Sequence, residues 1–199
     1  MEEVVVSEMN IAQVSEVAAI HMQTLPDDLL PSFGLRFLEN SYYKEIAKCP
    51  FSKVFVAICN KEVVGFVNIS YMPEKLSRYI LGKSFFAILF SLLKLLFVDF
   101  ERVKEFISVA LADGFHTEGV GEVSFIAVHP NFHGKGIAPL LVKRANESLY
   151  EQGVKRCFTK TLKRNLHVFS LYKKNFGAEI VKELKVYKKE YVFILWQTK

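Results

Sequence analysis

A strand, a glycine-rich turn and a helix follow one another without a break between Val123 and Leu141, in the sequence VSFIAVHPNFHGKGIAPLL. Gly134 and Gly136 have no Cβ atom, so the backbone there can approach a ligand closely. The free N–H groups of the first helical turn, aided by the helix dipole, form a binding site for phosphate. Pro139 suits that first turn because a missing N–H costs little there. The run therefore predicts a turn that binds a pyrophosphate.

Two other kinds of glycine loop fit this run poorly. A P-loop requires Ser or Thr after its Gly-Lys pair, whereas Gly136 and Ile137 follow Lys135. A dinucleotide-binding fingerprint requires glycine where Pro139 stands, and it follows an early strand. Two glycines before a helix also occur in ordinary strand-to-helix turns, so the surrounding chain has to decide.

Hydrophobic periodicity predicts strands and helices on both sides of the turn. Strands are predicted at 4–6, 54–59, 63–71, 122–128, 156–162, 178–186 and 191–197, and helices at 11–22, 33–46, 136–152 and 166–175. Asn10 and Ser32 are the expected N-caps of the first two helices, and Asn60-Lys61 is the expected tight turn. This order combines hairpins with right-handed crossovers, which predicts an α/β (α+β mixed) fold with a mixed sheet covered by helices, in a single domain at 1–199.

A helical insertion at about 73–119 separates the third strand from the fourth. Its stretch from Phe85 to Leu93 is apolar except for Ser91, which predicts a helix that is buried or covered by a partner. Its narrow polar strip is expected at Ser84, Ser91, Lys94, Glu101 and Glu105. Because Lys83 and Lys94 leave fewer than the roughly 20 apolar residues of a membrane span, no stable span is expected. A cap over the substrate cleft or a dimer contact is favoured, with membrane-surface attachment as the alternative.

The residues around the turn resemble a known family. Ala127-Val128-His129-Pro130, followed by His133-Gly134-Lys135-Gly136-Ile137-Ala138, is similar to the coenzyme A signature of GNAT acetyltransferases, Q/R-x-x-G-x-G/A. The similarity continues through the helix at 140–152, the strand at 157–162, Asn165 and Leu171-Tyr172, and covers roughly three quarters of the chain without the insertion. His133 replaces the usual Gln or Arg. Asn175-Phe176 replaces the usual Gly-Phe, with Asn expected to supply the left-handed helix cap.

This resemblance implies a mostly antiparallel sheet of about seven strands, whose fourth and fifth strands part to admit the pantetheine of acetyl-CoA. Backbone groups of Ile126 and Val128 would bind the pantetheine amides, and no metal is implied. Asn165 is equally explained as the N-cap of the next helix. The implied cofactor contacts are Ile126, Ala127, Val128, His133, Gly134, Lys135, Gly136, Ile137, Ala138 and Asn165.

Tyr172 and Glu122 are the expected catalytic residues. The family's matching tyrosine donates a proton to the departing thiolate, and a tyrosine hydroxyl is protonated at pH 7. Glu122 resembles the glutamate that serves as a base in part of the family, and it would act through water because an amine must lose its proton. His129 and His116 are weaker candidates for the base. The structural alternatives are a packed aromatic ring for Tyr172 and an exposed strand-end carboxylate for Glu122.

The sequence thus predicts an N-acetyltransferase that acts on the primary amine of a small molecule, with an amino sugar as one candidate, by direct attack in a ternary complex. The alternatives are a peptide acceptor and a non-catalytic acyl-CoA-binding sensor. The net charge of +5 comes from cations spread among anions, so nucleic acid is not an expected partner. The acidic start, Met1-Glu2-Glu3, argues against a secretory signal and for the cytoplasm.

Overall fold

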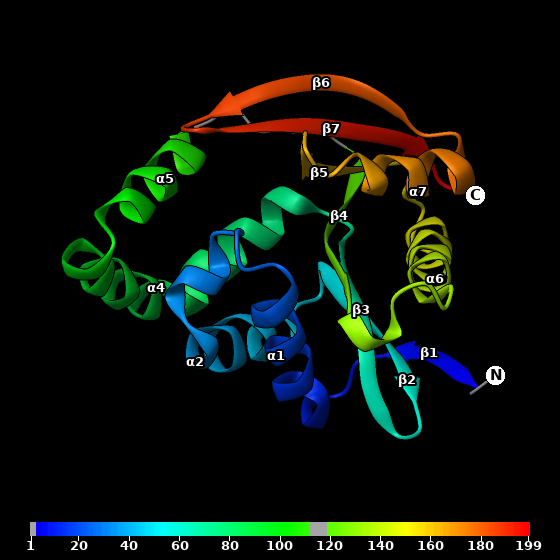
Figure 1. The fold of residues 1–199 in the computed structure, drawn as a ribbon, viewed down its shortest axis with the longest axis horizontal. Helices are drawn as coiled ribbons and strands as arrows, with labels where there is room; N and C mark the ends of the chain where they lie inside the picture. Colours follow the sequence, from blue (N-terminus) through cyan, green and yellow to red (C-terminus); the bar gives the residue numbers. More distant parts are fainter. Residues whose placement is uncertain (1–2, 112–118) are drawn as a thin grey trace.

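The computed structural model describes residues 3–111 and 119–199. Within these ranges the strands form one seven-stranded sheet in the order β1-β2-β3-β4-β5-β7-β6 (Figure 1). All neighbouring strands are antiparallel except β4 and β5, which are parallel. The predicted mixed, mostly antiparallel sheet is therefore confirmed. The strands are β1 (Val4–Glu8), β2 (Ser52–Cys59), β3 (Glu62–Ser70), β4 (Val120–Val128), β5 (Arg156–Leu162), β6 (Glu179–Val186) and β7 (Lys189–Gln197).

Helices cover both faces of the sheet (Figure 1). One face carries α6 (Ile137–Glu151) and α7 (Leu166–Phe176), with a buried apolar cluster beneath them. A second cluster lies under the helices of the opposite face, so the sheet separates two cores. The helical elements of that face are η1 (Ile11–Gln13), α1 (Val14–Thr24), η2 (Leu30–Phe33), α2 (Leu35–Phe37), η3 (Leu38–Tyr43), α3 (Lys44–Ile46) and α4 (Pro73–Val98).

Local hydrogen bonds explain where the first elements begin. The side chain of Asn10 accepts from the Ala12 amide at 2.9 Å, and the Asn10 amide donates to the Gln13 side-chain oxygen at 3.0 Å, which confirms the predicted cap. Asn60 and Lys61 both have positive φ angles, 51° and 69°, as expected for a two-residue turn between β2 and β3.

Two predicted caps are wrong. The hydroxyl of Ser32 donates back to the Leu29 carbonyl at 2.5 Å, and Gly34, with φ of 94°, precedes the helix instead. Asn175 remains inside α7, where its side-chain amide donates to the Leu171 carbonyl at 2.7 Å. Gly177 takes the left-handed position with φ of 68°, because a residue without Cβ adopts it at the lowest cost.

The insertion between β3 and β4 is helical, as predicted, and consists of α4 and α5 (Phe100–Leu111). The residues of the expected polar strip are divided between two environments: Lys94 and Glu101 are exposed, whereas Ser84, Ser91 and Glu105 are buried. Ser84 and Ser91 are buried, with 3% and 9% exposure, and the Ser84 hydroxyl donates to the Ser41 carbonyl in η3. Phe86 and Phe97 are instead 82% and 91% exposed. The small serines permit close packing on η3, so the apolar side of α4 faces outward rather than into the core.

Within the described ranges, α4 is the one helix long and apolar enough, by length and composition, to cross a membrane. Only 17% of its most apolar window is buried. Lys83 and Lys94 therefore do not disqualify it on composition, contrary to the expectation from the sequence.

β4 and β5 are paired over only part of their lengths. Their parallel ladder joins Val120–Val123 to Arg156–Thr159, and beyond these residues the two strands part. The register of β4 against β3 shifts at the same level, where Asn68 is opposite Phe125 and Ile69 opposite Val123, so that Ser124 is an extra, bulged residue. The gap that the resemblance implied is thus present, beside a β-bulge.

Candidate active site

The turn after β4 has the backbone shape of an anion-binding site. η4 (Pro130–Phe132) leads into Gly134 and Gly136, whose φ angles of 76° and 77° are left-handed, and α6 begins at the next residue. A Cβ added at either glycine would meet no atom within 4 Å, so the surface over the turn is open. Across the described ranges, no backbone or side-chain acceptor takes up the amide groups of residues 134–138. Unpaired amides at the start of a fifteen-residue helix fit a diphosphate.

His133, in the slot that holds Gln or Arg in the family signature, is tied to the end of β4. Its Nε2 lies 2.7 Å from the Val128 carbonyl oxygen. Because that oxygen can only accept, Nε2 carries the proton. The Lys135 ammonium lies 4.6 Å from the centre of the Phe132 ring and keeps positive charge at the turn.

The edge of β4 that faces the gap carries backbone groups that take part in no strand ladder among the described residues. The His129 amide donates to the Val64 carbonyl at 2.8 Å, so His129 and Ala127 direct their backbone groups toward β3. Alternate residues in an antiparallel ladder point to opposite edges. Ile126 and Val128 therefore point theirs toward β5, as expected for the pantetheine contacts, although the Val128 carbonyl is already engaged by His133.

A cavity of about 910 Å³ lies where β4 and β5 separate. It extends from Ser124–Ile126 and Thr159–Leu162 to the loop between α1 and η2. The helical insertion forms part of its wall through Leu76, Ser77 and Ile80 of α4 and Glu105 and Val109 of α5. Asn165 also lines it, and its side chain makes no capping hydrogen bond to α7, so the N-cap explanation does not account for this side chain.

Glu122 lines the same cavity from the start of β4. It lies opposite Phe158 in the β4–β5 ladder and is half-buried. Glu122 also lies near Tyr42: burial is the main cause of the raised pKa of Tyr42, and the charge of Glu122 raises that pKa further. The Tyr42 hydroxyl accepts a 3.1 Å hydrogen bond from Asn68. Glu122 is therefore a carboxylate at the cavity surface rather than at an exposed strand end.

Tyr172 is completely buried on the other face of the sheet. Its ring stacks on Trp196, with ring centres 4.6 Å apart and planes at 25°. Its hydroxyl has no hydrogen-bond partner among the described residues, an uncommon state for a buried polar atom. Burial raises the pKa of Tyr172, the Cys157 thiol raises it further, and the Thr159 hydroxyl partly opposes them. These neighbours place the hydroxyl at the level where β5 leaves β4.

The two expected catalytic residues thus approach the gap from opposite faces, and they do not touch. Glu122 faces the cavity, whereas Tyr172 belongs to the core under α6 and α7 and does not line it. His129 caps η4 through its Nδ1, which accepts from the Asn131 amide at 3.3 Å. His116 lies outside the described residues.

Sequence reasoning missed Asp28, which lines the cavity from the loop after α1. Burial raises the pKa of Asp28 to about 6, further raised by the charges of Asp27 and Glu105 and lowered by those of Lys189 and Lys160. No local motif marks this aspartate, because its partners come from α5 and from strands far along the chain.

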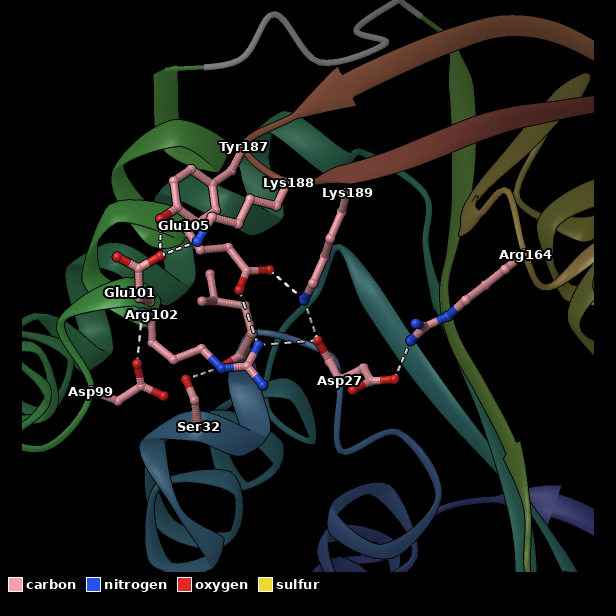
Figure 2. Close-up of polar contacts among 11 residues, drawn as sticks. Asp27, Ser32, Asp99, Glu101, Arg102, Glu105, Arg164, Tyr187, Lys188 and Lys189 are labelled. Atoms are coloured by element: carbon pink, nitrogen blue, oxygen red, sulfur yellow. Dashed lines mark hydrogen bonds and ion pairs between the residues drawn. The ribbon is translucent and has the colours of Figure 1, made fainter.

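An ion-pair cluster joins this loop to the insertion and to the β6–β7 hairpin. Figure 2 shows the Lys189 ammonium reaching both the Asp27 carbonyl and the Glu105 carboxylate, each at 2.6 Å. Arg102 donates to the other Glu105 oxygen at 3.0 Å, and Arg164 pairs with the Asp27 carboxylate. Glu105 is 5% exposed, so the cluster is partly buried, and its members Asp27, Glu105 and Arg164 line the cavity.

No group of three or more potential metal ligands gathers among residues 3–111 and 119–199. The three cysteines, Cys49, Cys59 and Cys157, are buried, and none forms a disulfide in the part of the chain that the structure describes. Burial raises the pKa of Cys157 well above its usual value, which disfavours the thiolate that a nucleophile would need.

A model of the acetyltransferase (GNAT) family matches residues 22–178. The fold resembles ribosomal-protein-S18-alanine N-acetyltransferase from Escherichia coli, with a TM-score of 0.63 and 10% identity over 99% of this chain and 95% of that one. A GNAT acetyltransferase from Streptococcus pneumoniae gives a TM-score of 0.61 and 17% identity over 99% and 100% of the two chains. PaiA N-acetyltransferase from Thermoplasma acidophilum, solved with coenzyme A, gives 0.61 and 10% over 98% and 99%. No curated protein has a sequence that matches this chain.

The structural likenesses are all at low identity and establish the fold. The family model independently covers the strand, the glycine turn and the tyrosine helix described above. This chain therefore belongs to the GNAT acetyltransferase family and is an acetyltransferase.

Proposed function

We propose that the protein transfers an acetyl group from acetyl-CoA to the primary amine of a small molecule. The observation that carries this proposal is the cavity that joins Glu122 to the parting of β4 and β5 under the helical insertion. Acetyl-CoA supplies the thioester. The amides of residues 134–138 would hold its diphosphate, and the backbone of Ile126 and the Val128 amide would hold its pantetheine.

The chemistry needs one group on each side of the gap. The amine nitrogen forms a bond to the thioester carbonyl carbon, and the carbon–sulfur bond breaks. Glu122 accepts the amine proton through water from the cavity side, and the Tyr172 hydroxyl gives a proton to the thiolate from the other. Burial raises the pKa of Tyr172, and it would also raise the pKa of a thiol formed beside it. The difference between the two pKa values, which sets the free energy of the proton transfer, therefore stays smaller than the pKa of Tyr172 alone would suggest.

The shape and charge of the cavity favour a compact, cationic acceptor. Four carboxylates, Asp27, Asp28, Glu105 and Glu122, line it together with two cations, Lys160 and Arg164. Carboxylates such as those of Asp28 and Glu122 stabilise an ammonium ion before it loses its proton. The α5 helix, joined to the β6–β7 hairpin through Glu105 and Lys189, forms part of the cavity wall, and we expect it to obstruct the approach of an extended peptide. This obstruction favours a small amine, such as an amino sugar or a polyamine, over a protein N-terminus.

The test is a thiol-release assay with acetyl-CoA, corrected for hydrolysis without acceptor. Wild type, Tyr172→Phe and Glu122→Gln are compared on a panel of amino sugars, polyamines and short peptides. The proposal expects a small amine to be the best acceptor, with kcat lowered about 100-fold or more by either substitution. Faster turnover of peptides than of every small amine would contradict the acceptor class. Tight coenzyme A binding without turnover on any acceptor would indicate a non-catalytic sensor.

A further inference from the structure

The outer face of α4 is an apolar surface that the protein itself leaves uncovered. We use this name for Phe85, Phe86, Leu89, Phe90, Leu93 and Phe97, all of them exposed. The opposite side of the helix packs on the body of the protein through Ser84, Ser91 and Leu95. In Figure 1, α4 and α5 project to one side of the molecule, away from α6 and α7.

This face is larger than the apolar patches of most monomeric proteins. Its four phenylalanines are 55–91% exposed, and an aromatic side chain offers about 150–250 Å². They alone present roughly 600 Å², at the upper end of what a soluble monomer normally exposes, and the two leucines add to it. A patch of this size indicates a binding surface.

The two charged residues within the outer face are both positive. Between Leu81 and Val98 the only charged residues are Lys83 and Lys94, both exposed. They are eleven residues apart, about three helical turns, and so lie along the same flank of the face. The two turns before it add Lys75 and Arg78 against the single carboxylate of Glu74. Carboxylates occur beyond the two ends of the face, at Glu74, Asp99 and Glu101, whereas the charged residues of the face itself are cations. These cations make it complementary to an apolar partner with an anionic surface.

The sheet topology excludes a helix that crosses a bilayer. β3 and β4, which flank the insertion, are hydrogen-bonded neighbours in one sheet. A single crossing in α4 would put them on opposite sides of the membrane unless the chain crossed back before Val120. Residues 99–119 carry too many charged side chains for that return. A membrane can therefore meet α4 only along its side.

We propose that the outer face of α4 binds the surface of a bilayer that contains anionic lipid. The helix lies parallel to the membrane plane, with its phenylalanines at the boundary between headgroups and acyl chains. Lys83 and Lys94 extend along the helix to the phosphate groups while their methylenes stay in the apolar layer. The buried side of α4 keeps its contacts with the protein, so binding requires no unfolding.

A second copy of the chain is a poorer match for the same surface. In a symmetric antiparallel pair centred between Lys83 and Lys94, the Lys83 of one copy would lie beside the Lys94 of the other. The outer face provides no carboxylate to separate these like charges. The area would suffice for a dimer, so charge rather than size decides between the two partners.

The test measures co-sedimentation of the full chain with vesicles of phosphatidylcholine alone and of phosphatidylcholine mixed with phosphatidylglycerol. We expect binding to the mixed vesicles that weakens about tenfold or more in Phe86→Glu and in Phe97→Glu. Tyr150→Glu is the matched control, because Tyr150 is an exposed aromatic residue on α6. Lys83→Glu with Lys94→Glu should also weaken binding, whereas Lys155→Glu with Lys174→Glu should not.

Circular dichroism confirms the fold of each variant, and light scattering gives its mass in solution. Absence of binding to the mixed vesicles overturns the proposal. So does equal loss in Tyr150→Glu and Phe86→Glu. A stable dimer that Phe86→Glu converts to a monomer, without vesicle binding by the wild type, would assign the face to a second copy instead. None of these readouts depends on acetyl transfer.

Discussion

The Thr159 hydroxyl donates a 2.8 Å hydrogen bond to the Val123 carbonyl, and these two residues form the last pair of the β4–β5 ladder. This side-chain bond fastens the two strands at the point where they begin to part. It also lies beside the Tyr172 hydroxyl and at the edge of the cavity. The width of the gap, and hence the site, depends on this junction.

Replacing Thr159 by Val should loosen the junction. The Val123 carbonyl loses a buried partner, which costs about 1–3 kcal/mol of the free energy of unfolding. Urea unfolding measures this cost, and the KM for acetyl-CoA should rise in parallel. Thr161→Val, in the same strand, is the control and should change stability by less than half as much. Equal effects of the two substitutions would contradict a special role for this bond.

Tyr172→Phe should separate catalysis from stability. Among the described residues the hydroxyl makes no hydrogen bond of normal geometry, and Thr159 is the polar side chain that acts on its pKa. Its removal should therefore leave the free energy of unfolding unchanged or raise it slightly. The ring still stacks on Trp196. A loss of kcat in a variant as stable as wild type therefore indicates proton donation rather than packing. Unchanged kcat would show that Tyr172 only packs the core.

His21 should make the protein sensitive to acid. Its Nδ1 lies 2.6 Å from the Tyr43 hydroxyl, its Nε2 has no partner in the described structure, and burial lowers its pKa to about 4. Between about pH 4 and 6.5 the unfolded chain binds more protons at this site, so stability falls as the pH falls. The lowering of the His21 pKa corresponds to about 3 kcal/mol of the free energy of unfolding, lost over the whole of this pH range.

The test compares the pH dependence of the free energy of unfolding in wild type with that in His21→Gln. The raised pKa of Asp28 acts in the opposite direction over an overlapping range, because the folded protein there binds more protons at Asp28. Subtracting the two curves of unfolding free energy against pH cancels Asp28. A flat difference between pH 4 and 6.5 would contradict the assignment to His21.

Lys189→Met should destabilise the protein more than Lys188→Met does. Lys189 neutralises Glu105, whose side chain is 7% exposed, and its loss leaves a buried carboxylate with Arg102 as its remaining partner. We expect a loss of about 1–3 kcal/mol. Lys188 pairs with Glu101 at the surface, where such pairs contribute about 0–1 kcal/mol. Urea unfolding of both variants measures these losses. Equal losses in Lys189→Met and Lys188→Met would contradict the prediction.

The sequence predicted features that short stretches of chain determine. The strand predicted at 156–162 coincides with β5, and Gly134 and Gly136 marked a turn whose backbone takes left-handed φ angles. It could not predict which side of α4 packs inward, because apolar residues surround that helix and the choice depends on its fit to η3. Ser32 and Asn175 are both plausible caps locally, but Gly34 and Gly177 took the positions instead.

The contacts of the site that join distant segments of the chain could not be predicted from the sequence either. Asp27 and Arg164 are paired across 137 positions, and nothing in either neighbourhood indicates the other. Glu122 and Tyr172 were both proposed from the sequence as catalytic residues, and the family resemblance implied the parting of the two strands. That the two side chains lie on opposite faces of the sheet at this parting is visible only in the structure.

The most direct test of the account is calorimetric titration of coenzyme A and of pantetheine into wild type and Gly136→Val. The amides of residues 134–138 should bind the diphosphate, so coenzyme A should bind at one site and pantetheine at least about 100-fold more weakly. Valine cannot easily adopt the left-handed φ of Gly136, so this variant should lose most of the affinity for coenzyme A and none of that for pantetheine. Equal affinity for the two ligands, or unchanged binding of coenzyme A by Gly136→Val, would contradict the account.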